Sequence, residues 1–472
     1  MSVGSASHDR TTKRLSPSSG AAPDGTEESR LFTWVEKVAG GTIRSSTQTS
    51  GGNRARSWAI DVQQPDGTLA EVFLRYSPPR PPGVEPYTTH REAQVYRAID
   101  GLDIRAPRLI AEHPDIPAIL TDRARGIAEF RRLTDAATKQ AIVTEVMTDL
   151  AKLHAHPAAG IALDGGGQGP RIADHVRVEL TIWRAMYDES GRPDGLLELA
   201  FRWLDANLPD PDGPVVLVHG DAGPGNFMFH DDRLTAIIDW ELAHLGDPME
   251  DLAWFSMRCV MEPVPDFPAS LADYESAAGQ RADRRRILYH RVLVSTRVVV
   301  IRHRNVTGEF ANAIVSRALN RRLLVEAMSD ASGVAVSWPA PIAAPATERG
   351  PLFAGILDDL RDVIVRRSTD NQVIAKAKNA AKVLKYLEAW DRFGIAVEAA
   401  ERESLEALLG VPDLDPARHA LVDAIRSDRL GFAEALRYFA GQAARDAQLA
   451  SGASGSIATR HYPAFAPEQQ QR

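Results

Sequence analysis

Apolar and polar residues alternate in short runs over the first quarter of the chain. The segments 57–62 and 69–76 each predict a half-buried strand, and Pro65-Asp66-Gly67 between them predicts the tight turn of a β-hairpin. The segment 89–99 changes to helical spacing, and two more short apolar runs follow it. The pattern therefore predicts a small β-rich unit over residues 30–125.

Longer segments with helical spacing dominate the rest of the chain. Apolar residues recur every three or four positions between residues 133 and 154, and this spacing returns in later segments. The alanine- and proline-rich stretch 332–350 predicts a linker. The ends, 1–29 and 451–472, are rich in small and polar residues, which predicts disordered tails. The remaining units are a mostly helical one at 126–331 and a separate helical domain at 351–450.

Length and composition narrow the class of protein. The chain of 472 residues is long enough for two or three domains, and its contents of 44% apolar and 25% charged residues are typical of globular proteins. A net charge of −8 argues against a nucleic-acid partner. No apolar run approaches the roughly 20 residues that span a bilayer. The N-terminus lacks the apolar core of a signal peptide, and the single cysteine, Cys259, excludes an internal disulfide. We therefore expect a cytoplasmic protein that contacts neither nucleic acid nor membrane.

The stretch 215–240 carries the strongest candidate chemistry. Its first four residues predict a buried strand, and the glycines and proline of GDAGPG force an irregular loop after it. A hairpin with a polar turn follows. The loop carries Asp221 and Asn226, and the return strand of the hairpin is expected to carry Asp239.

These three side chains match the needs of phosphoryl transfer from a nucleotide. One carboxylate must orient the acceptor hydroxyl and take its proton, while a second carboxylate and an amide oxygen hold Mg²⁺ against the phosphates. Protein kinases place the base and the amide in H-R-D-x-x-x-x-N. Here His219-Gly220-Asp221 precedes Asn226 with the same Asp-to-Asn spacing, and Asp239 takes the place of the metal-binding Asp of D-F-G. The alternative, in which Asp221 and Asp239 only cap turns, leaves this spacing unexplained.

The segment from His219 to Asp251 resembles the aminoglycoside phosphotransferase (APH) superfamily, through HGDxxPGNFxF followed by IIDWExAxxGDPxxDLA. The resemblance implies an α+β, bilobal protein-kinase-like fold, with a small β-rich N-lobe and a mostly helical C-lobe, followed here by an all-α bundle. It implies ATP and Mg²⁺ as cofactors, His219 and Asp221 in the catalytic motif, and Asn226 and Asp239 as metal ligands. Asp251 is expected to tie its helix back to the catalytic loop.

A narrower resemblance points to the kinase-like domain attached to some acyl-CoA dehydrogenases. It implies a hydroxylated small-molecule acceptor, with a hydroxyacyl-CoA as the favoured class. The region 351–450 loosely resembles the small helical companion of hydroxyacyl-CoA kinases, here fused into one chain. It is a candidate surface for a homodimer or another partner contact.

A glycine pair before the predicted hairpin is a candidate phosphate-binding segment. The residues are Ser50, Gly51, Gly52 and Asn53. In the family this segment covers the nucleotide phosphates, and glycine lets main-chain N–H groups approach them closely. A plain turn before a strand is the alternative.

Arg75 stands where the family carries its ATP-binding lysine. Arginine keeps the positive charge and can grip phosphate oxygens with two groups, but it is wider and planar. Glu92 is the expected ion-pair partner, as in the Lys–Glu pair of kinases. The alternative is a capping box that begins at Thr89, in which Glu92 bonds back to the first main-chain amide.

Eight arginines lie between Arg281 and Arg304, interleaved with apolar residues. As a helix, this segment would present a basic face, either as ordinary solvated surface or as a contact for a phosphorylated acceptor such as coenzyme A.

Three functions remain open at this point. The first is a hydroxyacyl-CoA kinase. The second is an aminoglycoside O-phosphotransferase, which would need an acidic acceptor pocket. The third is a nucleotide-binding pseudokinase scaffold, against which the intact Asp221, Asn226 and Asp239 argue.

Overall fold

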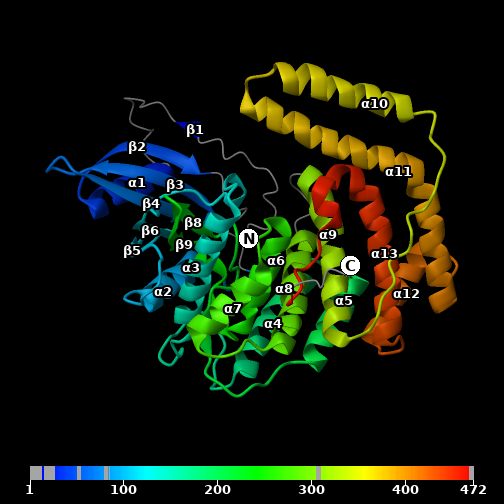
Figure 1. Cartoon of the computed structure of the whole chain (residues 1–472), viewed down its shortest axis with the longest axis horizontal. Helices are drawn as coiled ribbons and strands as arrows, with labels where there is room; N and C mark the ends of the chain where they lie inside the picture. Colours follow the sequence, from blue (N-terminus) through cyan, green and yellow to red (C-terminus); the bar gives the residue numbers. More distant parts are fainter. Residues whose placement is uncertain are drawn as a thin grey trace.

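The computed structural model describes residues 13–14, 27–49, 55–78, 83, 85–304 and 310–466. A β-rich N-lobe lies at one end of the molecule, a helical C-lobe in the middle, and the C-terminal helices at the other end (Figure 1). The predicted α+β fold with two lobes and a following all-α region is confirmed.

The N-lobe is an antiparallel sheet with the strand order β1-β2-β3-β4-β6-β5. The predicted hairpin is confirmed, because β3 pairs with β4 from Arg56–Tyr76 to Gln63–Leu69. Alternation places Ile60 and Leu74 in a core with Val35 of α1, whereas Arg75 faces the opposite side. The elements are β1 (Lys13–Arg14), α1 (Glu27–Ala39), β2 (Thr42–Thr49), β3 (Arg56–Gln63), β4 (Leu69–Tyr76), α2 (Thr89–Ile99), β5 (Leu109–Glu112) and β6 (Ala118–Asp122).

The C-lobe is built from long helices and two small sheets, β7 with β10 and β8 with β9. These short strands carry the loops of the candidate site. None of the helices in the described ranges combines the length and apolar character needed to cross a membrane. The elements are η1 (Phe130–Arg132), α3 (Ala136–His154), α4 (Ile172–Asp188), α5 (Gly195–Ala206), β7 (Val216–Val218), β8 (Phe227–His230), β9 (Arg233–Ile237), η2 (Trp240–Leu242), β10 (His244–Gly246), α6 (Met249–Met261), α7 (Phe267–Ala278), α8 (Arg284–Arg304) and α9 (Phe310–Ser332).

The C-terminal helices share one hydrophobic core with the C-lobe. Where α12 and α13 meet α5, a Cβ at Gly195 would lie only 3.0 Å from the ring of Phe439, so glycine permits the close approach. At the top of Figure 1, α10 and α11 run side by side away from this core. The elements are α10 (Gly350–Asp358), the π-helical η3 (Asp359–Val365), α11 (Asn371–Leu409), α12 (Leu414–Arg426), α13 (Phe432–Ser454) and η4 (Gly455–Thr459).

The disordered tail predicted from residue 451 onward is wrong as far as residue 466. Tyr462 is buried, its hydroxyl lies 2.6 Å from that of Ser295, and its main-chain N–H donates to Glu326 at 2.9 Å. The rings of Tyr462 and Phe465 also pack against the guanidinium of Arg291. Two aromatic anchors thus order a segment whose composition is otherwise small and polar.

The N-terminal tail predicted for residues 1–29 ends earlier than expected, because α1 begins at Glu27. Apart from residues 13–14, the preceding part of that prediction lies outside the described residues.

Candidate active site

The loop 219–226 follows β7 and is anchored by Asp251 in the first turn of α6. The Asp251 carboxylate accepts hydrogen bonds from the main-chain N–H groups of His219 at 2.7 Å and Gly220 at 2.9 Å. His154 Nε2 lies 3.0 Å from the same carboxylate. Burial alone would raise the pKa of Asp251, but its contacts with His154 outweigh burial and lower it. The anchoring role predicted for Asp251 is confirmed.

The ring of His219 holds this loop against the segment that follows β9. Its Nε2 lies 2.9 Å from the main-chain oxygen of Ile238, and its Nδ1 lies 3.2 Å from the main-chain nitrogen of Asp221. A ring that carries its proton on Nε2 satisfies both contacts. Gly220 has φ +76°, and any side chain there would collide with the carbonyl oxygen of Leu242. His219 therefore contacts neighbouring main chain, as a positioning residue does.

Asp221 is buried and held by two side chains. Asn226 Nδ2 donates to the Asp221 carboxylate and to its main-chain oxygen, both at 2.9 Å. Arg258 of α6 donates from Nε to Oδ1 at 2.8 Å and from a second nitrogen to Oδ2. Burial raises the pKa of Asp221, although the charge of Arg258 pulls in the opposite direction. The structure therefore joins the predicted base to the predicted amide ligand.

Asp239 adopts an unusual backbone conformation just beyond the strand expected to contain it. The strand β9 ends at Ile237, and Asp239 has φ 69° and ψ 56°, in the left-handed region. Aspartate tolerates this region better than most residues, and such conformations concentrate at functional sites. Its Oδ1 accepts a hydrogen bond from Arg75 at 2.8 Å.

Arg75 contacts three carboxylates at once. Its Nε lies 3.0 Å from Glu92, its Nη1 contacts Asp239, and its Nη2 contacts Glu241. Burial would lower the pKa of Arg75, but the three carboxylates raise it well above its usual value. Burial raises the pKa of Glu92 to about 7, against the pull of Arg75.

The ion pair predicted between Arg75 and Glu92 is confirmed, and the capping box that would begin at Thr89 is wrong. Helix α2 is capped one residue earlier, by Thr88, whose side chain accepts from the main-chain N–H of Arg91 at 3.1 Å. Because Thr88 is the cap, the Glu92 side chain is available for its contact with Arg75.

The predicted phosphate-binding segment Ser50, Gly51, Gly52 and Asn53 lies outside the described residues. The described strands on either side are β2, which ends at Thr49, and β3, which begins at Arg56 and pairs with it.

Asn226 and Asp239 are a suitable donor set for magnesium bound together with a nucleotide. Magnesium usually takes one or two protein carboxylates or amides and completes its shell with phosphate oxygens and water. The amide oxygen of Asn226 and the carboxylate of Asp239 would satisfy that requirement beside the phosphates of a bound nucleotide. Among the described residues no cluster of three or more His, Cys, Asp or Glu side chains has metal-binding geometry.

Sequence reasoning missed Arg258 and Glu241 as parts of this site. Arg258 stands seven residues after Asp251 on α6, and this spacing places both on one helical face, toward the catalytic loop. Glu241 stands two residues after Asp239 and contacts Arg75. The helical spacing was a usable signal for Arg258.

The solvated basic face expected for Arg281 to Arg304 is corrected at Arg286 and Arg297, which turn toward acids of the C-lobe, whereas Arg284 and Arg285 are exposed. The expected contact with a phosphorylated acceptor stays a prediction. Arg297 contacts Glu179 at 3.1 Å and also Glu250, and it is 1% exposed. Arg286 contacts Asp247. Acids on neighbouring helices and loops therefore bind these charges inside the C-lobe.

A β-rich lobe over a helical lobe, with a carboxylate and an amide in one loop and a second carboxylate beside a cation, defines a kinase-like phosphotransferase. The model of the phosphotransferase enzyme family (APH) matches residues 45–289, just over half of the chain. The chain belongs to this family.

Two relatives of this chain differ in how much of their own length the match covers. Acyl-CoA dehydrogenase family member 11 from Homo sapiens is 31% identical over 196 residues, which are 39% of this chain and 25% of that protein. The match therefore spans about a quarter of that relative's length. Viomycin phosphotransferase from Streptomyces vinaceus is 30% identical over 178 residues, covering 34% of this chain and 59% of that enzyme.

A solved structure confirms the fold. A candidate aminoglycoside phosphotransferase from Ralstonia eutropha superposes with a TM-score of 0.51 at 20% identity, and the superposition covers 65% of this chain and 98% of that one. At this identity the likeness establishes the kinase-like fold alone.

Proposed function

We propose that this chain transfers the terminal phosphoryl group of ATP to a hydroxyl group of a hydroxyacyl-CoA. The observation that carries the proposal is the buried contact between Asp221 and Asn226, close enough to Asp239 for its charge to act on the pKa of Asp221. A base, an amide oxygen and a second carboxylate in this arrangement are the parts that phosphoryl transfer needs.

In the proposed reaction the acceptor oxygen attacks the γ-phosphorus and its proton passes to Asp221. The bond from that phosphorus to the β,γ-bridging oxygen breaks, and ADP leaves with the electron pair. Asn226 and Arg258 hold the Asp221 carboxylate in one orientation. Magnesium, held by Asn226 and Asp239, would neutralise charge on the phosphate oxygens. Arg75, beside Asp239, would bind phosphate oxygens in place of the family's lysine.

The acceptor class rests on the similarity to acyl-CoA dehydrogenase family member 11. In an acyl chain, phosphorylation would turn a poor leaving group, hydroxide, into a good one. The similarity to viomycin phosphotransferase supports a second candidate, an antibiotic acceptor, by the same chemistry.

The acceptor is tested by measuring ATP consumption with Mg²⁺ on 3- and 4-hydroxyacyl-CoAs, several aminoglycosides and viomycin. We expect that, of these acceptors, only the hydroxyacyl-CoAs are turned over. Turnover on an antibiotic alone would replace the proposed acceptor, and ATP binding without turnover on any of them would favour the scaffold hypothesis.

Asp221→Asn tests the proposed base. It should lower kcat by roughly 10²- to 10⁴-fold, the usual contribution of a general base, because the amide cannot accept the hydroxyl proton. ATP binding should stay within about twofold. The matched control is Asp232→Asn, at an exposed hairpin turn with φ 60°, which asparagine also tolerates. Equal turnover in the two variants would reject Asp221 as the base.

A further inference from the structure

A cavity of about 630 Å³ lies between the C-lobe and the C-terminal helices. One wall belongs to the catalytic loop, through Pro224 and Gly225, and another to α11. Residues of α9 and of the end of α13 also line it. The cavity is therefore built jointly by the family domain and by helices that lie beyond the matched residues 45–289.

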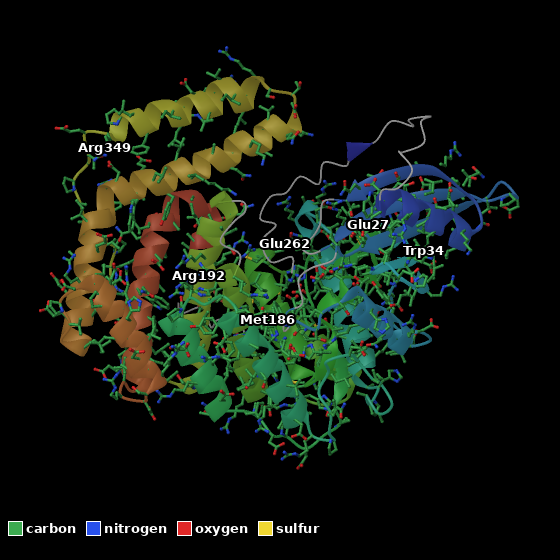
Figure 2. The ribbon with its side chains drawn as sticks, turned by 180° about the vertical axis from the view of Figure 1, so that it is seen from behind. Glu27, Trp34, Met186, Arg192, Glu262 and Arg349 are labelled. Atoms are coloured by element: carbon green, nitrogen blue, oxygen red, sulfur yellow. The ribbon has the colours of Figure 1, made fainter. Side chains whose placement is uncertain are left out.

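The lining of this cavity is strongly cationic, although the chain as a whole carries a net charge of −8. Within the described part of the lining, Glu262 is the only carboxylate. Figure 2 shows Glu262 near the middle of the molecule, below α10 and α11. The cations are Arg131, Lys139, Arg258, Lys378, Lys382, Lys385 and Arg460.

Three of these cations lie on one face of α11. Lys378, Lys382 and Lys385 are spaced four and three residues apart, so their side chains project in the same direction. Lys382 donates to Asn312 at 3.1 Å. Among the described residues, no carboxylate lies within ion-pair distance of Lys378 or Lys385. Like charges at this spacing repel one another, and a bound anion with several charges would relieve that repulsion.

The cavity lies beside the loop that carries the proposed base. Arg258 lines it and also holds the carboxylate of Asp221, while Pro224 and Gly225 lie between Asp221 and Asn226 in the sequence. From this neighbourhood we expect that an acceptor whose hydroxyl meets Asp221 extends into the cationic space. Phosphate groups are the anions that lysine and arginine clusters bind best.

We propose that this cavity binds the phosphate-bearing part of the acceptor, and that Lys378, Lys382 and Lys385 of α11 make the C-terminal helices part of the substrate site. The inference rests on the proposed function, since it assigns a place to the coenzyme A portion of a hydroxyacyl-CoA. The dense positive charge also disfavours a polycationic acceptor such as an aminoglycoside.

The direct test is calorimetric titration of coenzyme A into the full chain, with AMP-PNP and Mg²⁺ present in excess so that coenzyme A cannot bind as a nucleotide. We expect coenzyme A to bind. Combined Lys378→Gln, Lys382→Gln and Lys385→Gln should weaken binding by roughly tenfold or more, because each lysine supplies a charge-assisted contact. Absence of binding to the wild type, or equal binding by the variant, would overturn the inference.

The chain offers a matched control on the same helix. Lys376 is exposed and does not line the cavity. Lys376→Gln should leave coenzyme A binding unchanged, whereas Lys378→Gln should weaken it. If both single variants weaken binding equally, the effect comes from net charge and the cavity is not the site.

Turnover separates this inference from the proposed function. Hydroxyacyl-CoA is compared with the hydroxyacyl-pantetheine thioester, which lacks the phosphates. A much higher KM for the pantetheine thioester, with the lysine variant affected only on hydroxyacyl-CoA, supports the inference. Equal KM values for the two thioesters would overturn it while leaving the proposed function intact. No turnover of either thioester would reject the proposed function, and the titration would still decide whether the cavity binds coenzyme A.

Discussion

Helices α8 and α11 both carry clusters of cations, and the fold treats the two clusters in opposite ways. On α8, Arg286 and Arg297 turn inward and contact buried acids. On α11, Lys378 and Lys385 lie at exposed positions on a cavity wall. The difference teaches that a run of cations along a helix does not by itself mark an anion site, since the acids on neighbouring elements decide whether those charges are already neutralised.

The acids that neutralise Arg286 and Arg297 come from two parts of the C-lobe, helix α4 and the start of α6. Glu179 lies on α4, Asp247 lies just before α6, and Glu250 lies in its first turn. Arg297 contacts both glutamates, and its guanidinium also lies over the ring of Trp183 at 5.6 Å. A buried arginine with such partners contributes to the structure of the C-lobe and is not available to a substrate.

We expect the largest effect on the free energy of unfolding from a substitution on α8. Arg297→Met would leave Glu179 and Glu250 buried without the arginine that contacts both of them, and removing one partner of a buried ion pair typically lowers the free energy of unfolding by about 3–5 kcal/mol. Chemical denaturation followed by tryptophan fluorescence measures the loss, and Lys378→Met is the matched change on α11. A loss below about 1 kcal/mol in Arg297→Met would contradict the structural role of this arginine.

We expect an intermediate effect on stability when a lower pH protonates Asp247, the partner of Arg286 on α8. Burial raises the pKa of Asp247, but His290 and Arg286 outweigh burial and lower it from 3.8 to about 2. A carboxylate with a lowered pKa stabilises the folded state above its unfolded pKa, and this contribution disappears as pH falls from about 4 to about 2. The stability difference between wild type and Asp247→Asn should shrink by about 2 kcal/mol over this window. A constant difference would mean that Asp247 is not held as a charged group.

We expect the smallest effect on the free energy of unfolding from a substitution on α11. Lys378→Met should change the free energy of unfolding by less than about 0.5 kcal/mol, as for most exposed residues without ionic partners. Lys376→Met is the control, because it is exposed on the same helix and lies outside the cavity lining. A clear loss of stability in Lys378→Met alone would assign this lysine to the structure and would remove the contrast with α8.

Local patterns predicted the β-hairpin of the N-lobe well, and they pointed to the candidate site. The β-hairpin was found from alternation and an Asp-Gly turn, and Asp221, Asn226 and Asp239 were found from their spacing. Asp239 nevertheless lies outside the predicted strand, because its left-handed backbone cannot continue a strand. The sequence also left the partner of Glu92 open, and the position of one helix cap decided it.

Contacts between distant segments were the part that the sequence could not supply. Arg286 meets Asp247 across 39 positions, and Arg297 meets Glu179 across 118. The helical region predicted as a separate domain shares its core with the C-lobe, and the tail expected to be disordered is held by Tyr462. The local sequence does not specify which acidic side chain contacts which arginine.

The sequence by itself determined the chemistry proposed for this protein, because two carboxylates and an amide at fixed spacing occupy one strand, loop and hairpin whose geometry is local. The tertiary structure decided which cations are free to meet an anion. That outcome depends on packing between α8 and the acids of α4 and α6, and between α11 and a cavity wall with one carboxylate. Electrostatic pairing depends on distance in space, which the order of residues along the chain does not specify.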